Sequence, residues 1–179
     1  MPRLNPIPLP SVEYLHSRFT LDAVAGVLTW RSRPREDFSS DGEFKRWNAR
    51  YANKVAGMLG DQGYRRIRLR PYHHLMVAHR IIYKMMTGQE PPETVDHING
   101  RRADNRPEQL RPATLAEQAR NRNHRSNKTG YRGVTLTANG KWRATIQKLH
   151  LGTFDTAQEA EAAYRTEARK RYGEFYRET

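Results

Sequence analysis

The sequence predicts an α+β fold made of two small modules, each combining short antiparallel strands with a helix. Residues 95–123 pass from a β-prone run through a turn and two prolines into a capped helix. Residues 130–175 pass from a hairpin pattern into a second capped helix. Only 36% of the 179 residues are hydrophobic and the mean hydropathy is -0.95, which disfavours one large core. We therefore expect domains at residues 1–125 and 126–179.

The amino-terminal residues alternate helical and extended patterns. Residues 2–10 are rich in proline and lack the apolar region of a signal peptide, so we expect an extended lead-in. A capped apolar pattern predicts a helix over residues 11–19, and a β-prone run predicts a strand over residues 27–30. Residues 32–42 have the composition of a loop, and residues 44–60 fit either irregular structure or a packed turn.

Arginines alternate with apolar residues along residues 64–70, which predicts a strand with one apolar and one basic face. The apolar positions are Ile67 and Leu69, and the basic positions are Arg66, Arg68 and Arg70. The basic face fits either a solvated surface or a contact with DNA phosphates. The net charge of +13 and the motif at residues 95–123, which is described below, favour the contact with DNA.

Residues 72–88 carry apolar side chains at helical spacing and end in Gly88, which suits the left-handed cap of a helix. We expect a core helix here. His73, His74 and His79 offer imidazoles to a metal ion, but we favour a structural role for them.

We expect the chemistry in the stretch 95–123. Asp96 and His97 stand side by side in a β-prone run that ends at a turn, and prolines allow only a brief second strand. Thr114 and Glu117 have the spacing of a capping box, so a helix should begin there. The expected order is strand, turn, short strand and helix.

The helix of this stretch offers oxygen ligands to the strand. Gln118 and Asn121 are three residues apart and share one face, so packing over the strand would bring two amide oxygens toward Asp96 and His97. A hard divalent cation takes oxygen ligands, and a neutral imidazole beside it can accept a proton from water. This combination suits hydrolysis of a phosphodiester. The alternative is a hairpin end whose Asp and Asn side chains bond their own backbone.

The same stretch resembles the HNH nucleases of the phage type, whose pattern runs D-H-I-x-G, D-N-R-x-x-N-L-R and T-x-x-E-N-x-x-N. The matching residues are Asp96, His97, Ile98, Gly100, Asp104, Asn105, Arg106, Leu110, Arg111, Thr114, Glu117 and Asn121. Earlier segments such as G-V-L-T-W and A-H-R are also similar to that family. The resemblance implies a ββα-metal nuclease core.

The resemblance to HNH nucleases also implies roles for individual residues. His97 would be the general base, Asp96 would hold one Mg²⁺ or Mn²⁺, and Asn105 would brace the loop. The family has asparagine where this chain has Gln109, which would orient the base, and Gln118, which would complete the metal site. Each glutamine keeps the donors and acceptors of the amide but moves its oxygen by one methylene.

The carboxy-terminal residues 130–147 predict a β-hairpin with one apolar and one polar face. The apolar face would carry Val134, Leu136, Trp142, Ala144 and Ile146. The polar face would carry Thr135, Thr137, Lys141, Arg143, Thr145 and Gln147. Thr156 and Glu159 cap a following helix whose alanine stripe can lie close to the apolar face. The polar face is then left for a groove of DNA.

Y-R-G-V, G-K-W-x-A-x-I and L-G-T-F-D-T-x-x-E-A resemble the ethylene-response-factor (apetala-type) DNA-binding domain, which phage homing endonucleases also carry, over residues 127–175. The resemblance implies a three-stranded antiparallel sheet, packed on one helix, in the major groove. The contacts it implies are made by Arg132, Thr135, Thr137, Asn139, Thr145 and Gln147. The dipeptide 148–149 is poor for a primed turn, so the sequence leaves the pairing of the third strand open.

The charge of the chain points to nucleic acid. The net charge is +13 and the sequence pI is about 10.4, with arginine and lysine spread along the chain. This distribution fits a protein on a polyanion, because each neutralised phosphate releases counterions. We expect double-stranded DNA as the partner, with no membrane and no organic cofactor. The absence of cysteine excludes disulfides and is compatible with the cytoplasm of a bacterial or phage-infected cell.

Together these patterns predict a metal-dependent DNA endonuclease of the HNH homing type, whose first module cuts and whose second module reads or positions. A monomer would nick one strand, whereas a double-strand break needs a dimer or a second binding event. The alternative is a non-catalytic, sequence-specific DNA-binding protein in which Gln109 and Gln118 mark a decayed nuclease site. An RNA-binding module is a weaker alternative.

Overall fold

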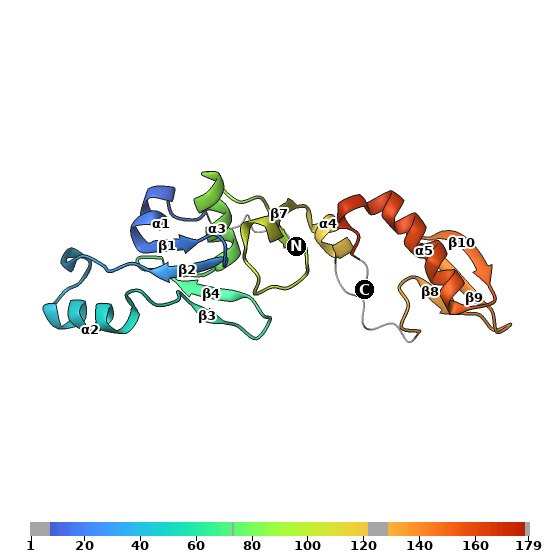
Figure 1. Cartoon of the computed structure of the whole chain (residues 1–179), viewed down its shortest axis with the longest axis horizontal. Coiled ribbons are helices and arrows are strands. Elements are labelled where there is room, and N and C mark those ends of the chain that lie inside the picture. The colour runs from blue at the N-terminus through green and yellow to red at the C-terminus, as the bar shows by residue number, and fades with distance from the viewer. Residues whose placement is uncertain (1–7, 73, 122–128, 178–179) are drawn as a thin grey trace. The chain divides into compact units, whose positions relative to one another are not determined.

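The computed structural model describes residues 8–72, 74–121 and 129–177, and the chain divides into two compact units, Met1–Thr114 and Leu115–Thr179 (Figure 1). Both units mix helices with small antiparallel sheets, in agreement with the predicted α+β class. The units divide after Thr114, so the helix that follows it belongs to the second unit. The predicted boundary near Ser126 lies outside the described residues.

The described part of the first unit contains three separate antiparallel sheets, β1-β2, β3-β4-β5 and β6-β7. In chain order its elements are α1 (Val12–Arg18), β1 (Phe19–Asp22), β2 (Val27–Trp30), η1 (Arg35–Asp37), α2 (Asp41–Tyr51), β3 (Met58–Leu59), β4 (Arg65–Arg68), β5 (Leu75–Val77), α3 (Ala78–Thr87), β6 (Thr94–His97), η2 (Pro107–Gln109) and β7 (Leu110–Ala113).

One apolar core joins α1, α3 and the first two sheets of this unit. Its fully buried members include Leu15, Phe19, Leu28, Ile67 and Ile81. The predicted helix over 11–19 and the predicted strand over 27–30 are confirmed as α1 and β2. The alternation along β4 is also confirmed, because its apolar positions are buried while its arginines are exposed or half-buried.

Two expectations for this unit differ from the structure. Helix α2 occupies part of the segments that we expected to be a loop or left open. It has no buried residue, so no apolar stripe marks it, although the Ser40 hydroxyl caps it by accepting from the amide of Glu43 at 3.2 Å. The expected helix over 72–88 begins only at Ala78, because β5 precedes it, and it ends as expected at Gly88, where φ is 75°.

The second unit packs one long helix on a three-stranded antiparallel sheet. Its described elements are α4 (Leu115–Asn121), β8 (Val134–Leu136), β9 (Trp142–Ile146), β10 (Leu149–Phe154), α5 (Ala157–Tyr172) and η3 (Gly173–Phe175), with β9 in the centre of the sheet. The predicted capping box is confirmed, since Thr156 and Glu159 exchange side-chain and backbone hydrogen bonds at 3.2 and 3.1 Å. The small residues Ala160 and Ala168 are fully buried, so α5 lies close to the sheet.

The third strand and one apolar position depart from the expectations for the hairpin. Strand β10 pairs with β9 through a tight turn in which Gln147 and Lys148 adopt φ values of 47° and 70°, so non-glycine residues make the primed turn that we left open. Leu136 is 57% exposed, although we expected it on the apolar face. It ends β8 beside the turn and lies outside the cluster of Val134, Ala144 and Ala160. No helix in the described part of either unit is long and apolar enough to cross a membrane.

Candidate functional site

The β6-β7 pair places Asp96 and His97 in a buried position at the end of a strand. Asp96 faces Arg111 across the pair, and His97 faces Leu110. Asp96 and His97 are only 5% and 4% exposed. The second strand starts later than the turn at residues 99–100 suggests, because the chain first makes a long loop and the turn of η2, which begins at a proline. The predicted strand, turn, strand and helix are present in that order, with this loop inserted.

The carboxylate of Asp96 forms a buried ion pair with Arg111. Oδ2 of Asp96 accepts from Nε of Arg111 at 3.2 Å and from its Nη2 at 3.0 Å. The side chains are 7% and 9% exposed, so solvent screens the pair poorly. We had assigned no role to Arg111. The signal for it was the opposite charge at the register partner of Asp96 in an antiparallel pair.

The imidazole of His97 is oriented by Asn105. Its Nε2 lies 3.1 Å from Oδ1 of Asn105, which is 2% exposed. Because an amide oxygen only accepts, the neutral imidazole carries its proton on Nε2 and its lone pair on Nδ1. In the structure the side chain of Asn105 therefore makes the contact with His97 that the resemblance implies for Gln109. Gln109 instead contributes its backbone carbonyl, which accepts from the amide of Ile98 at 2.9 Å.

Two aromatic rings from other elements lie next to the imidazole of His97. The ring of His79, on α3, packs edge to face against it with the ring centroids 4.9 Å apart. The ring centroid of Tyr64 lies 6.0 Å from that of His97. Burial lowers the pKa of His97, against the opposing effects of Asn105 and Asp96. His97 is therefore neutral near pH 7, which is the form that can accept a proton. Sequence reasoning missed Tyr64 and gave His79 a structural role without this contact.

The loop that carries Asn105 is held by Asp104. Its carboxylate accepts from Nε and Nη2 of Arg106 at 2.8 and 2.7 Å and from the amide of Asn99 at 2.7 Å. The hydrogen bonds from Arg106 hold the pKa of Asp104 well below its usual range. The D-N-R run of the sequence therefore serves the shape of the loop on both sides of Asn105.

Gly26, in the turn between β1 and β2, lies directly behind this loop. Its φ is +66°, and a Cβ at this position would lie 2.2 Å from the backbone nitrogen of Arg106 and 2.4 Å from the carbonyl carbon of Asn105. Such distances exclude any side chain without a shift of the loop. The first hairpin of the chain therefore supports the backbone of Asn105.

Of the predicted metal ligands, Asp96 lies in the first unit, where its Oδ2 accepts from Arg111. No group of three or more His, Asp or Glu side chains in the described ranges could hold a metal ion. Mg²⁺ typically keeps several waters and binds through one or two carboxylates together with substrate phosphates. A site with one protein carboxylate, such as Asp96, is therefore compatible with Mg²⁺. Gln118 and Asn121, the other predicted ligands, lie on α4 in the second unit.

Among the predicted DNA contacts of the second unit, Thr135, Arg143 and Thr145 lie on β8 and β9, and Thr137, Asn139, Lys141 and Gln147 lie in or beside the turns that join the strands. Exposed side chains there are Thr135, Asn139, Lys141, Arg143 and Gln147, and half-exposed ones are Thr137 and Thr145. Arg132 differs, because its Nη1 donates to the carbonyl of Arg120 at 2.9 Å and its guanidinium lies 6.0 Å from the ring of Tyr164. The structure thus engages Arg132 in packing against the helices.

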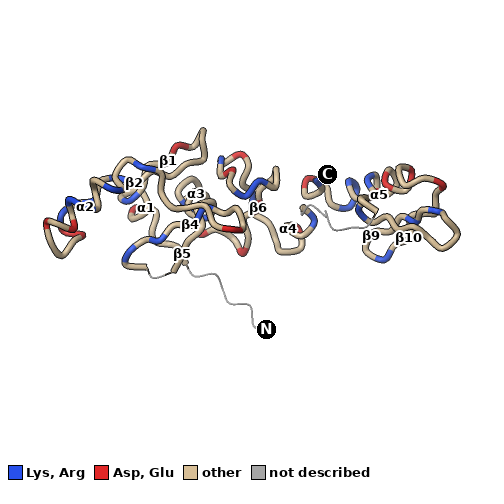
Figure 2. Tube along the Cα trace, turned by 90° about the horizontal axis from the view of Figure 1, so that it is seen from below, with Lys and Arg blue, Asp and Glu red and all other residues tan. Residues whose placement is uncertain are grey.

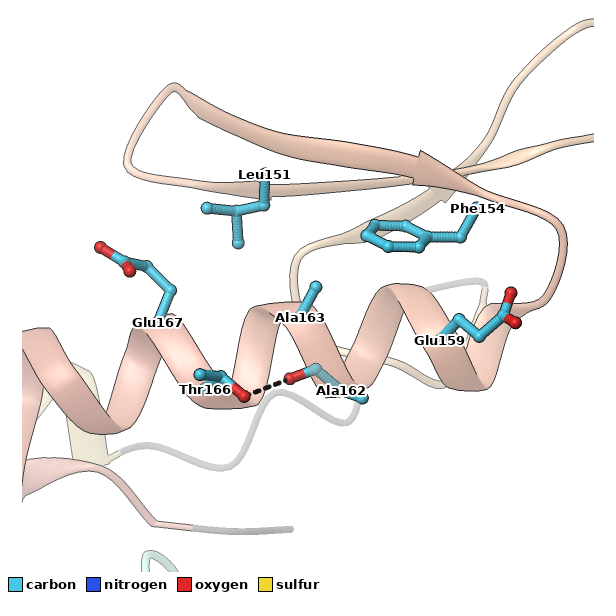
Figure 3. Close-up of a pocket in the computed structure, with 7 residues that line it drawn as sticks. All are labelled: Leu151, Phe154, Glu159, Ala162, Ala163, Thr166 and Glu167. Atoms are coloured by element: carbon cyan, nitrogen blue, oxygen red, sulfur yellow. Dashed lines mark hydrogen bonds between the residues drawn. The ribbon is translucent and has the colours of Figure 1, made fainter.

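Basic residues occur along the traces of both units, including β4 (Figure 2). Of the predicted basic residues, Arg66 and Arg68 lie on β4, and Arg70 follows its end. Arg68 and Arg70 are exposed, and Arg66 lies 4.0 Å from Asp61. A groove between β10 and α5 is different in character (Figure 3). Leu151, Phe154 and Ala163 line it and glutamates stand at its ends, so it does not suit a phosphate.

The burial of His79 predicts acid sensitivity. Burial, aided by the electrostatic effects of the neighbouring His97 and Arg80, lowers the pKa of His79 to about 3. In the unfolded chain His79 takes up a proton near pH 6.5, whereas in the folded chain it stays neutral. The free energy of unfolding therefore falls as the pH drops below about 6.5. Between pH 7.5 and 5 we expect this residue to cost about 2 kcal/mol. Urea unfolding at the two pH values measures the loss.

His79→Phe keeps the ring and removes the titration, so this variant should show a smaller loss of stability between pH 7.5 and 5. His16→Phe, at an exposed position of α1, should retain the wild-type loss. An unchanged pH dependence in His79→Phe would contradict the assignment.

Residues 77–120 match the family model of an HNH endonuclease. The match runs from the end of β5 through α3, the β6-β7 pair and most of α4, and it therefore includes Asp96, His97 and Asn105. It supports a nuclease that acts on DNA, in a family that generally uses a divalent metal ion. No solved structure matches the chain.

Proposed function

We propose that the chain is a metal-dependent DNA endonuclease of the HNH homing type. The observation that carries this proposal is the buried pair Asp96 and His97, in which Nε2 of His97 is hydrogen-bonded to Oδ1 of Asn105. All three residues lie in the segment that matches the HNH model. A hairpin end stabilised only by its own backbone would not need an orienting amide from the loop. The geometry therefore favours a catalytic histidine.

In the proposed reaction, Nδ1 of His97 accepts a proton from the water that attacks the phosphorus of a phosphodiester. Asn105 keeps the proton of the imidazole on Nε2 and holds the ring in place. Asp96 would hold Mg²⁺ or Mn²⁺, which when bound stabilises the developing charge on the phosphate and the leaving oxygen. Arg111 fixes the orientation of the Asp96 carboxylate.

We propose DNA binding for the second unit, in the manner of the ethylene-response-factor domain that it resembles. The support is a set of exposed polar and basic residues on this sheet and its turns: Arg143 lies on β9, and Lys141 and Gln147 lie next to its two ends. Lys141 also forms an ion pair with Asp155 at 2.8 Å. Because both groups are exposed, the ion pair is weak and Lys141 can bind a DNA phosphate in place of Asp155. In the first unit, Arg68 and Arg70 would add phosphate contacts.

The test is incubation of the full chain with supercoiled plasmid in Mg²⁺ or Mn²⁺, with EDTA as the metal-free control. We expect nicked or linear product only with the metal, because hydrolysis needs charge stabilisation at the phosphate. Nicked product alone would indicate one active site per DNA molecule.

The competing function is a DNA-binding protein with a decayed nuclease site. It predicts retarded mobility of duplex DNA without product at any metal concentration and across varied DNA sequences. That result would reject the nuclease and leave the binding role. Stronger binding to RNA than to duplex DNA at matched salt would favour an RNA-binding module instead.

A further inference from the structure

A buried guanidinium in the first unit has no anionic partner of its own. The side chain of Arg33 is 7% exposed and, in the part of the chain that the structure describes, makes no hydrogen bond or ion pair. Its Nε and that of Arg18 are the buried side-chain nitrogens without a hydrogen-bond partner among the described residues. Burial of an unpaired charge is strongly unfavourable, so such a group calls for a function.

The surrounding elements hold Arg33 firmly in this position. Asn48 of α2 accepts from the amide of Arg33 at 2.9 Å and donates to its carbonyl at 3.0 Å. The guanidinium lies 4.5 Å from the ring of Trp47 and 5.5 Å from that of Trp30, and the two rings stand at 82° to each other. Arg33 thus occupies a corner between two indoles, which fixes its orientation through cation-π contacts.

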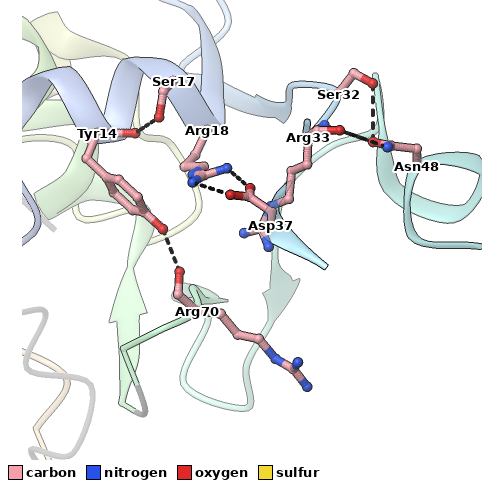
Figure 4. Close-up of polar contacts among 8 residues, drawn as sticks. All are labelled: Tyr14, Ser17, Arg18, Ser32, Arg33, Asp37, Asn48 and Arg70. Atoms are coloured by element: carbon pink, nitrogen blue, oxygen red, sulfur yellow. Dashed lines mark hydrogen bonds and ion pairs between the residues drawn. The ribbon is translucent and has the colours of Figure 1, made fainter. Parts of the chain in front are cut away.

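The neighbouring carboxylate is already taken. Asp37 accepts from Nη1 of Arg18 through one oxygen and from its Nη2 at 3.0 Å through the other (Figure 4). Both oxygens of Asp37 are therefore bonded to Arg18, and Asp37 acts on Arg33 only through a weaker electrostatic attraction. Burial and the positive charges of Arg18 and Arg70 lower the pKa of Arg33, while Tyr14 and Asp37 act in the opposite direction.

We propose that Arg33, with Arg18 beside it, forms a phosphate-binding site between β2, η1 and α2. A phosphate supplies both the hydrogen-bond acceptors and the negative charge that Arg33 lacks, whereas water supplies acceptors only. The planar guanidinium presents its donors in a fork that matches two phosphate oxygens. The phosphate comes either from a nucleic-acid backbone or from free phosphate.

The first test follows thermal unfolding of the full chain by tryptophan fluorescence, in sodium phosphate and in sodium chloride at equal ionic strength and pH. We expect saturating phosphate to raise the Tm by roughly 4 °C or more above that in chloride. Arg33→Met should lose this increment, and its Tm in chloride should not fall, because the variant removes an unpaired buried charge. Arg50→Met is the matched control, since Arg50 also lies over an aromatic ring, Tyr51, at 5.3 Å but is exposed. It should keep the increment.

The second test identifies the source of the phosphate. Binding of a labelled duplex is measured against salt concentration in Ca²⁺, with the wild-type chain and Arg33→Met. Loss of one backbone contact lowers the slope of log K against log salt by about 0.9. An unchanged slope with a lost phosphate increment assigns the site to free phosphate.

Two results overturn the proposal: no increment of the wild-type chain over chloride, or a full increment in Arg33→Met. Arg33→Gln removes the same charge and is measured in parallel, so that a folding defect in one variant leaves the test intact. Both tests are independent of DNA cleavage.

Discussion

Replacement of His97 by alanine is expected to lower the rate of DNA cleavage by about 10²- to 10⁴-fold, the usual contribution of a general base. The imidazole is buried, neutral and oriented through Nε2 by Asn105, which leaves Nδ1 to accept the proton of the attacking water. Binding of duplex DNA should change little, because a buried neutral ring adds no charge that attracts phosphate. Single-turnover cleavage of supercoiled plasmid and a binding titration measure the two quantities.

His16→Ala is the control for this prediction, because His16 is an exposed residue of α1 and should leave the rate unchanged. Unfolding of His97→Ala in urea separates lost chemistry from lost structure. Cleavage at the wild-type rate by a folded His97→Ala chain would exclude His97 as the base and point to a contaminating nuclease or to another residue.

Arg111→Met is expected to lower the free energy of unfolding by about 3–5 kcal/mol, since it removes the guanidinium that donates two hydrogen bonds to the buried carboxylate of Asp96. Asp96 and Arg111 are only 5% and 7% exposed, so solvent screens the ion pair poorly and its loss is costly. Urea unfolding monitored by tryptophan fluorescence measures the loss. Arg106→Met breaks the ion pair with Asp104 at a much more exposed position and should have a much smaller effect.

The double variant Asp96→Asn with Arg111→Met distinguishes an unpaired charge from lost packing. Because it removes both charges, it should recover a substantial part of the stability lost in Arg111→Met. If the double variant is no more stable than the single one, the loss comes from packing of the arginine side chain and the assignment to charge is wrong.

Local chemistry explains what could be predicted from the sequence. The caps at Ser11 and Thr156 depend on residues within four positions, and the alternation along β4 depends only on the period of a strand. Helix α2 escaped prediction because it buries no residue and so lacks an apolar stripe. The turn before β10 could not be predicted, because Gln147 and Lys148 adopt positive φ values that non-glycine residues disfavour. The pairing of β10 with β9 imposes this conformation.

The placement of Asp96 and His97 could be predicted from the sequence, but the contacts that hold them could not. Asp96 and His97 stand together in the sequence, and so their proximity needed no fold. Asn105 took the place expected for Gln109 because the loop conformation depends on Asp104 and on a distant turn, neither of which the spacing of the motif reveals. The contact of His97 with His79 likewise joins elements that are separate in sequence.

The contact of Gly26 with the loop of Asn105 has a consequence for how this motif can be inherited or transplanted. The segment that matches the HNH model begins at residue 77 and leaves the first hairpin behind. If that segment alone were grafted into another protein, it would lack the β1-β2 turn that packs against the loop of Asn105. The smallest segment that carries this support would reach back beyond Gly26, and a comparison limited to the motif would overlook a glycine whose missing side chain the loop of Asn105 requires.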